Sequence, residues 1–279
     1  MLSILMLFKD CGNVNITSFL NTFSNIINMV KSYKSFGRVV YNVIEKSDII
    51  LEILDARFID ETRNYMIEHK IENEKKILIH VINKCDFVSQ KFLEKEKKHL
   101  ENCVFVSAKK HLGTKMLKEK IMILARRNKI KDPIVGVVGY PNVGKSSVIN
   151  ALKGKQSARI SPEAGFTRGM QLVRISREMM MVDTPGIMPR DETNDFELVK
   201  LGAKKPESIS DPDLAVHELM KEHPGLMERH YGVEICVDKD KTLGKIADKF
   251  NLKIKGNLPD IHRVSKKILF DWQNGKIRR

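Results

Sequence analysis

The chain has 279 residues, of which 42% are hydrophobic, and a formal net charge of +14. This length allows one large hydrophobic core and a smaller second unit, and the composition excludes disordered and fibrous proteins. The excess of lysine and arginine, densest between Lys109 and Lys131, favours a polyanionic partner such as RNA or an anionic membrane surface. Solvated helix faces would explain these residues equally well.

The four cysteines show no C-x-x-C spacing, which indicates free thiols in a reducing compartment rather than disulfides or a metal site. The apolar start, residues 1–8, is too short for a signal peptide, and no apolar run is long enough to span a membrane. We therefore expect a cytoplasmic monomer without stable membrane insertion. Residues 1–36 are predicted to form an N-terminal helical extension, unless translation begins at Met29.

From residue 37 onward, short apolar runs alternate with helical patterns. The runs predicted to form buried strands are residues 48–54, 77–82, 103–106, 134–138 and 178–182. Strands that alternate with helices imply a mostly parallel sheet with helices on both faces. Because ligands bind beyond the carboxyl ends of such strands, polar motifs that follow these runs can share one pocket.

Residues 139–146, Gly-Tyr-Pro-Asn-Val-Gly-Lys-Ser, follow the fourth of these strands and precede a helical pattern. In this context the pattern G-x-x-x-x-G-K-[ST] predicts a loop whose backbone N–H groups bind the phosphates of a nucleoside triphosphate. We expect Lys145 to bridge the β- and γ-phosphates and the Ser146 hydroxyl to ligate Mg²⁺. The predicted phosphate-binding residues of the loop are Gly139, Asn142, Val143, Gly144, Lys145, Ser146 and Ser147.

Two motifs that come before this loop predict the base. Residues 83–86, Asn-Lys-Cys-Asp, have the form N-K-x-D, and residues 107–109, Ser-Ala-Lys, the form S-A-K. The Asp86 carboxylate can accept from guanine N1–H and the N2 amine, which adenine lacks. We expect Asn83 to tie this loop to the phosphate loop and the Ala108 N–H to donate to guanine O6. The predicted guanine-binding residues are Asn83, Lys84, Asp86, Ser107, Ala108 and Lys109.

After the strand at 178–182, residues 183–186 read Asp-Thr-Pro-Gly, a D-x-x-G motif. It predicts Asp183 close to Mg²⁺ and the Gly186 N–H at the γ-phosphate. Thr167 is the candidate that completes the Mg²⁺ shell, although it could be an ordinary loop residue. We therefore predict Lys145, Thr167 and Gly186 as catalytic residues, and Ser146, Thr167 and Asp183 as ligands of Mg²⁺.

The guanine motifs precede the phosphate loop, whereas in an ordinary GTPase they follow D-x-x-G. This order indicates a circular permutation, which is tolerable because the same strands still form the same sheet. We expect an α/β P-loop NTPase fold with a circularly permuted GTPase domain over residues 37–190, built on a mostly parallel six-stranded sheet. Residues 191–279 have helical patterns, including a helix start at Asp211-Pro212, and are predicted to form a small all-helical domain. This domain either binds RNA or serves only for packing.

The motifs N-K-x-D, S-A-K, G-x-P-N-V-G-K-S, G-F-T-R-G and D-T-P-G, in this order, resemble the circularly permuted GTPases of the YlqF/RbgA family. Asp55-Ala-Arg57 and Arg63-Asn64 are similar to the family's D-A-R and R-N segments. The resemblance covers about residues 38–190 and continues more loosely into residues 222–232. It implies hydrolysis of GTP to GDP and phosphate with Mg²⁺, and a role as a nucleotide-dependent switch that docks on the large ribosomal subunit or its rRNA during assembly.

By the same resemblance, Asn142 matches the asparagine that binds K⁺ in potassium-activated GTPases. Ile187 stands where Ras-like proteins have the glutamine that orients water, and an apolar side chain cannot do this. Bacterial family members also carry a histidine in an F-P-G-H-M segment, where this chain has Ser35-Phe-Gly-Arg38. We therefore expect slow hydrolysis unless K⁺ or the ribosomal subunit stimulates it. Two alternatives stay open: a GTPase of RNA modification or of a membrane surface, and an RNA-binding scaffold that holds GTP without hydrolysing it.

Overall fold

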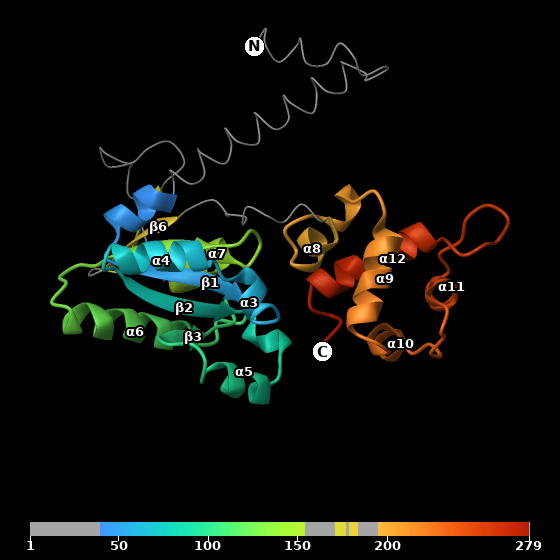
Figure 1. Ribbon diagram of the computed structural model, residues 1–279, viewed down its shortest axis with the longest axis horizontal. Helices are drawn as coiled ribbons and strands as arrows, with labels where there is room; N and C mark the ends of the chain where they lie inside the picture. The colour runs from blue at the N-terminus through green and yellow to red at the C-terminus, as the bar shows by residue number, and fades with distance from the viewer. Residues whose placement is uncertain (1–39, 154–170, 177–178, 184–194, 279) are drawn as a thin grey trace, which may run out of the picture. The chain divides into compact units, whose positions relative to one another are not determined.

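The computed structural model describes residues 40–153, 171–176, 179–183 and 195–278. By the density of internal contacts the chain divides into two compact units, residues 1–42 and residues 43–279. The strands and helices described below belong to the second unit, and Figure 1 labels most of them. Residues 40–46 are helical, and the expected helical extension, residues 1–36, lies outside the described residues.

One six-stranded sheet organises the first part of this unit, in the strand order β3-β2-β1-β4-β6-β5 (Figure 1). The strands are β1 Ile49–Asp55, β2 Ile77–Asn83, β3 Cys103–Phe105, β4 Ile134–Gly139, β5 Gln171–Ser176 and β6 Met179–Asp183. Five of them run parallel, and β5 is antiparallel to β6. The predicted mostly parallel α/β sheet is confirmed. The sequence pattern had not located β5, an edge strand that lies outside the five runs predicted to form strands.

The helices that accompany the sheet are α3 Ile59–Thr62, α4 Tyr65–Asn73, α5 Gln90–Glu96, α6 Thr114–Arg127 and α7 Lys145–Leu152, with the 3₁₀ turn η1 at Cys85–Phe87. Helices α6 and α7 pack against each other on one face, where Leu117 and Val148 join Leu51 of β1 in the core. Helix α4 lies on the other face, since the N–H of its N-cap residue Asn64 donates a hydrogen bond to the Glu52 side chain of β1. Helices on both faces are what the alternating pattern predicted.

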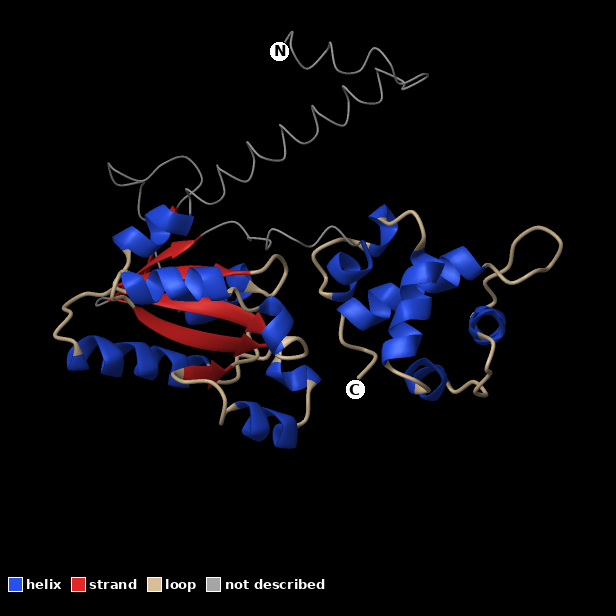
Figure 2. Cartoon of the chain, viewed as in Figure 1, coloured by secondary structure: helices blue, strands red, loops and turns tan. Residues whose placement is uncertain are grey.

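Residues 195–278 contain only helices and loops, as Figure 2 shows. The helices are α8 Asp195–Lys200, α9 Pro212–Glu222, α10 Leu226–Tyr231, α11 Lys239–Lys249 and α12 Ile261–Gln273, with a 3₁₀ turn η2 at Pro206–Ser208. The predicted helix start at Asp211-Pro212 is confirmed. In α9 Leu214 is 59% exposed, whereas Ala215 and Val216 are buried in the core. Among the described residues, no helix combines the length and the hydrophobicity needed to cross a bilayer.

Candidate nucleotide-binding site

The carboxyl ends of the central strands bring three predicted motifs to one edge of the sheet. In the parallel register, Asp55 at the end of β1 pairs with Asn83 at the end of β2, and Ile53 pairs with Gly139 at the end of β4. The N-K-x-D segment and the phosphate loop therefore begin on either side of the carboxyl end of β1. This edge is where open parallel sheets bind their ligands.

The phosphate loop joins β4 to α7 through two glycines that no other residue could replace. Gly139 has φ +144°, and an added Cβ would lie 2.5 Å from the Ile53 carbonyl oxygen. Gly144 has φ +101°, and its Cβ would lie 2.3 Å from Nδ2 of Asn83. A side chain at either position would be strained in the backbone and would collide with the neighbouring strand or loop. The close approach of the two motifs thus depends on these glycines.

Lys145 begins α7 and is buried. Its Nζ donates to the carbonyl oxygens of Gly139 at 3.2 Å and Tyr140 at 2.8 Å, so the ammonium lies inside the curve of the loop. Ser146 and Ser147 follow in the first turn of the helix and are exposed. A helix N-terminus with inward-directed N–H groups, a lysine and exposed hydroxyls is suited to bind phosphate.

Asn83 links three predicted motifs with one side-chain amide. Its Nδ2 donates to the Val143 carbonyl oxygen of the phosphate loop at 2.8 Å, and its Oδ1 accepts from the Ala108 N–H at 3.1 Å. The expected tie between the N-K-x-D segment and the phosphate loop is therefore present. The Ala108 N–H, which was expected to donate to guanine O6, donates to Asn83 in this structure. Because the Asn83 side chain is buried, both bonds are protected from competing water.

Asp86 is half-buried beside the S-A-K segment. Burial by itself would raise the pKa of this carboxyl group, but hydrogen bonds from Ser107 and Lys110 outweigh that effect and lower the pKa below its ordinary value. Asp86 is consequently a carboxylate at neutral pH, as acceptance from two guanine donors requires. Lys110, whose Nζ lies 3.1 Å from Asp86 Oδ2, was missed by sequence reasoning. Both Lys110 and the predicted Lys109 are exposed.

The Asp55-Ala-Arg57 segment stabilises the same edge of the sheet through a buried ion pair at the end of β1. Asp55 is fully buried, and Arg57 binds it with a fork of two hydrogen bonds, Nε–Oδ1 at 3.0 Å and Nη2–Oδ2 at 2.8 Å. Lys84 of N-K-x-D adds a bond to Asp55 Oδ2 at 2.7 Å and another to the Asn142 carbonyl oxygen at 2.9 Å. Burial would raise the pKa of Asp55, but Arg57 and Lys84 hold it at about 2.

Residues 195–278 contact this edge through hydrogen bonds from Arg57 and Asn142, among other contacts. The second amino group of Arg57, Nη1, donates to the Trp272 carbonyl oxygen at the end of α12 at 2.8 Å. The Nδ2 atom of Asn142 in the phosphate loop donates to the Gly202 carbonyl oxygen at 2.6 Å. A cation at the carboxyl end of a helix satisfies carbonyl groups that lack partners within the helix. No sequence motif predicted either contact.

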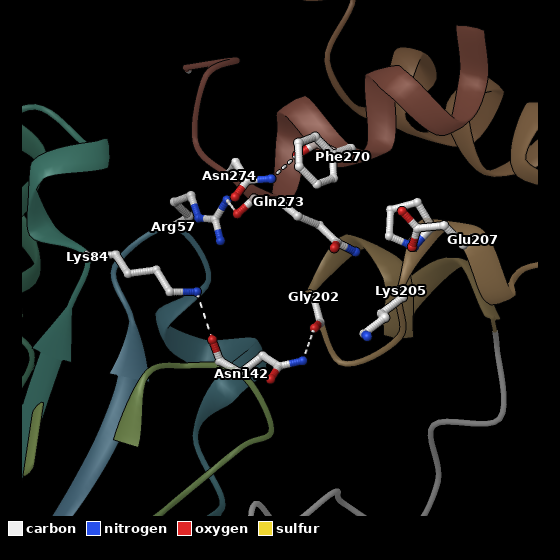
Figure 3. A pocket seen from close by; sticks show the side chains of 10 residues that line it. Arg57, Lys84, Asn142, Gly202, Lys205, Glu207, Phe270, Gln273 and Asn274 are labelled. Atoms are coloured by element: carbon white, nitrogen blue, oxygen red, sulfur yellow. Dashed lines mark hydrogen bonds between the residues drawn. The ribbon is translucent and has the colours of Figure 1, made fainter. Parts of the chain in front are cut away.

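A pocket of about 540 Å³ lies between these contacts, as Figure 3 shows. Arg57, Lys84 and Asn142 line one side, and Lys205 and Gln273 belong to the other. Its charged residues are Arg57, Lys84 and Lys205 together with Glu207, and both Arg57 and Lys84 are paired with Asp55. The pocket lies beside both the phosphate loop and the N-K-x-D lysine.

Three of the predicted residues are not placed by the structure. Thr167 and Gly186 lie outside the described residues, and Asp183 ends β6 but its side chain is not described. The roles assigned to them in Mg²⁺ binding and in catalysis stay predictions. The same holds for Ile187 and for the assignment of the K⁺ ligand to Asn142.

Known proteins with similar sequences have related descriptions. The family described as "50S ribosome-binding GTPase" matches residues 134–244. An uncharacterized GTP-binding protein of Methanocaldococcus jannaschii is 39% identical over 245 residues, covering 86% of this chain and 65% of that protein. Nuclear/nucleolar GTPase 2 of Oryza sativa is 33% identical over 250 residues, covering 85% of this chain and 46% of its own length. The chain thus spans less than two thirds of these relatives.

The crystal structure of GNP-bound YlqF from T. maritima matches 87% of this chain and 94% of its own, with a TM-score of 0.62 and 24% identity. This chain has the fold of YlqF. The order of motifs indicated a resemblance to the YlqF/RbgA family, and at the level of the fold this resemblance is confirmed. In the YlqF fold seen here, β2 and β3 with the guanine motifs precede β4 and the phosphate loop in the chain, yet all three meet at one edge of the sheet.

Proposed function

We propose that this protein binds GTP with Mg²⁺, hydrolyses it to GDP and phosphate, and acts as a nucleotide-dependent switch in assembly of the large ribosomal subunit. The observation that carries the nucleotide part is the Asn83 side chain, which binds the phosphate loop at Val143 and the S-A-K segment at Ala108. One amide thereby holds the predicted triphosphate and guanine motifs in a single site.

The choice of guanine is tested by Asp86→Asn. An amide in place of the carboxylate presents an N–H₂ group, which repels the guanine N2 amine but can donate to the C2 oxygen of xanthine. We expect the affinity for GTP to fall at least about tenfold and the affinity for XTP to rise. Binding of fluorescent GTP, XTP and ATP analogues measures this, with the exposed Asp60→Asn as a control for charge. Equal loss of all three nucleotides in Asp86→Asn would contradict the assignment.

The metal ions are proposed from the kinds of oxygen atoms available. The exposed Ser146 hydroxyl in the first turn of α7 is a hard oxygen ligand of the type that Mg²⁺ prefers, and Thr167 and Asp183 are the further candidates. For K⁺ the candidate is the Asn142 side-chain oxygen, because Nδ2 of the same amide is bound to Gly202. A bound K⁺ would supply positive charge next to the transferred phosphate.

Hydrolysis is proposed to be slow without stimulation, with Lys145, Thr167 and Gly186 taking part. Single-turnover hydrolysis in K⁺ and in Na⁺ buffers tests this. We expect K⁺ to accelerate hydrolysis in the wild type and to have no effect in Asn142→Ala, which removes the proposed K⁺ ligand. Fast hydrolysis that is the same in both buffers would contradict both the slow basal rate and the K⁺ site.

The ribosomal role is supported by the "50S ribosome-binding GTPase" description of the matching family and by the net charge of +14. Co-sedimentation with large ribosomal subunits, with a non-hydrolysable GTP analogue or with GDP, is the test. We expect retention with the analogue and release with GDP. Binding to RNA or vesicles alone would favour the alternative functions, and binding that ignores the nucleotide would favour a scaffold. The cytoplasmic location and the monomeric state stay predictions.

We also propose that residues 191–279 form a domain that responds to the nucleotide. The supporting contacts run from Lys84 through Asp55 to Arg57 and on to the Trp272 carbonyl oxygen. Trp272 is the only tryptophan of the chain, so its fluorescence reports this contact directly. We expect different emission with a GTP analogue and with GDP, and no difference in Arg57→Met. Identical emission in the two nucleotide states of the wild type would contradict the coupling.

A further inference from the structure

Away from the nucleotide site, three ionisable side chains converge between α4 and the sheet. Glu52 and His80 are direct neighbours in the register of β1 and β2, and Glu68 comes from α4. One ligand-type atom of each lies within 4.8 Å of the other two. We refer to Glu52, Glu68 and His80 as the buried triad. Strands buried on both faces seldom carry such residues unless they are paired or bind a metal ion.

Two atoms of the buried triad point at one another without a hydrogen bond. Glu52 is fully buried, and although its Oε1 accepts from the Asn64 N–H at 2.9 Å, its Oε2 has no hydrogen-bond partner among the described residues. His80 is 7% exposed, and its Nε2 likewise has no hydrogen-bond partner among the described residues. Buried polar atoms without partners are costly, so this arrangement requires an explanation.

The orientation of the His80 ring is fixed by its other nitrogen. Nδ1 lies 3.2 Å from the Glu101 carbonyl oxygen, which can only accept, so Nδ1 carries a proton. Nε2, the other ring nitrogen, faces Glu52 Oε2, 3.5 Å away, and Glu68 Oε1, 3.6 Å away. A ring N–H bound to a backbone carbonyl is the usual support of a metal-ligating histidine.

These separations fit a small cation better than direct bonds. Around a tetrahedral ion with bonds of about 2.1 Å, ligand atoms lie about 3.4 Å apart. Arg63 binds Glu68 through Nε at 2.8 Å and Nη2 at 2.7 Å, whereas no Lys or Arg side chain of the described residues forms an ion pair with Glu52.

An ion could reach this position from solvent. A second pocket of about 570 Å³ is lined by Glu68, His80 and Glu101, among other residues, so two members of the triad border it. Water in this pocket could supply a fourth ligand. One imidazole with two carboxylates favours Zn²⁺ or a similar transition-metal ion, since Mg²⁺ and Ca²⁺ prefer oxygen ligands alone.

We propose that Glu52, Glu68 and His80 form a binding site for one divalent transition-metal ion, with Zn²⁺ as the probe, that joins α4 to β1 and β2. The site is separate from the nucleotide site and does not depend on the proposed GTPase function. Its role is structural, because an ion held by three elements stabilises the folded chain in proportion to its affinity.

The test uses the full chain, stripped with a chelator and kept free of nucleotide and Mg²⁺. We expect reloading to give about one tightly bound Zn²⁺ per chain, a higher melting temperature, and a visible spectrum of tetrahedral coordination when Co²⁺ replaces Zn²⁺. Absence of stoichiometric metal in the wild type would overturn the proposal, and this outcome needs no variant to fold.

Matched variants locate the ion. His80→Gln and Glu52→Gln should lose the Zn²⁺-dependent rise in melting temperature, whereas His69→Gln, which removes an exposed histidine of α4, should keep it. GDP affinity serves as the folding control for each variant. If Glu52→Gln binds Zn²⁺ like the wild type, the ion is held elsewhere and the proposal is wrong. If the Glu52→Gln substitution instead stabilises the chain and the wild type takes up no metal, the triad only shares a proton and the proposal is wrong as well.

Discussion

Asp55→Asn is the substitution whose effect the structure defines most closely. The carboxylate is fully buried, binds the Arg57 fork and the Lys84 ammonium, and has a pKa held at about 2 against an ordinary value of about 3.9. A difference of about two pKa units corresponds to about 2–3 kcal/mol of folding free energy. The asparagine variant should lose this amount at pH 7.

The sign of the pH dependence follows from the lowered pKa. A carboxyl group whose pKa is lower in the folded state stabilises the fold fully above its unfolded-state pKa and loses this contribution as pH falls toward the folded-state pKa. The gap between wild type and Asp55→Asn should therefore be constant from pH 7 to about pH 5. It should then shrink as pH falls from about 4 toward about 2.

Urea unfolding at a series of pH values measures this gap, with Asp60→Asn as the control. Asp60 carries the same charge on α3, but its side chain is exposed and forms no ion pair within the described part of the chain. A double-mutant cycle with Arg57→Met isolates the pair, because the double variant should be little worse than Arg57→Met alone. A gap below about 1 kcal/mol at pH 7, or one that does not change with pH, would refute the reasoning.

Two glycine substitutions test the close contacts of the site. Gly144→Ala should lower GTP affinity at least about tenfold in a nucleotide-binding titration, because the new Cβ would lie 2.3 Å from Asn83 Nδ2 and displace the amide from the phosphate loop; unchanged affinity would contradict this. Gly275→Ala should lower the free energy of unfolding by about 1–3 kcal/mol, since its Cβ would lie 2.4 Å from the Phe87 ring. Gly256→Ala is the control, with φ +89° but no atom within 4 Å, and an equal loss there would show that backbone strain alone is responsible.

The contacts between the nucleotide edge and α12 suggest why the D-A-R segment accompanies the GTPase motifs. Asp55 receives Lys84 from the guanine motif on one side and Arg57 on the other, and Arg57 continues to the Trp272 carbonyl oxygen. Movement of Lys84 on nucleotide binding would remove one partner of the buried Asp55 carboxylate. Because such a loss is energetically costly, Arg57 would have to adjust, and its hydrogen bond to the end of α12 would change. Of the D-x-x-G motif, only the backbone of Asp183 lies within the described residues.

Sequence reasoning succeeded where the chemistry is local to a short segment. A phosphate loop works through its own backbone, so the spacing of Gly139, Gly144 and Lys145 is enough to predict its shape. Sequence reasoning failed where an ionisable residue occurs within an otherwise apolar strand. The strands at Glu52 and His80 were interpreted as apolar runs, and the signal missed was that two ionisable residues occur in strands buried on both faces.

The amino-acid sequence by itself determined the fold class, the permuted order of the motifs and the residues that form the phosphate loop. These properties follow from backbone geometry and from hydrophobic runs, both of which are written in neighbouring residues. Only the tertiary structure decided that Arg57 binds the end of α12, that Asn142 binds Gly202, and that the carboxylate of Glu68 lies next to that of Glu52. These partners lie far apart in the chain, and the packing of helices on the sheet, rather than any local preference, brings them together.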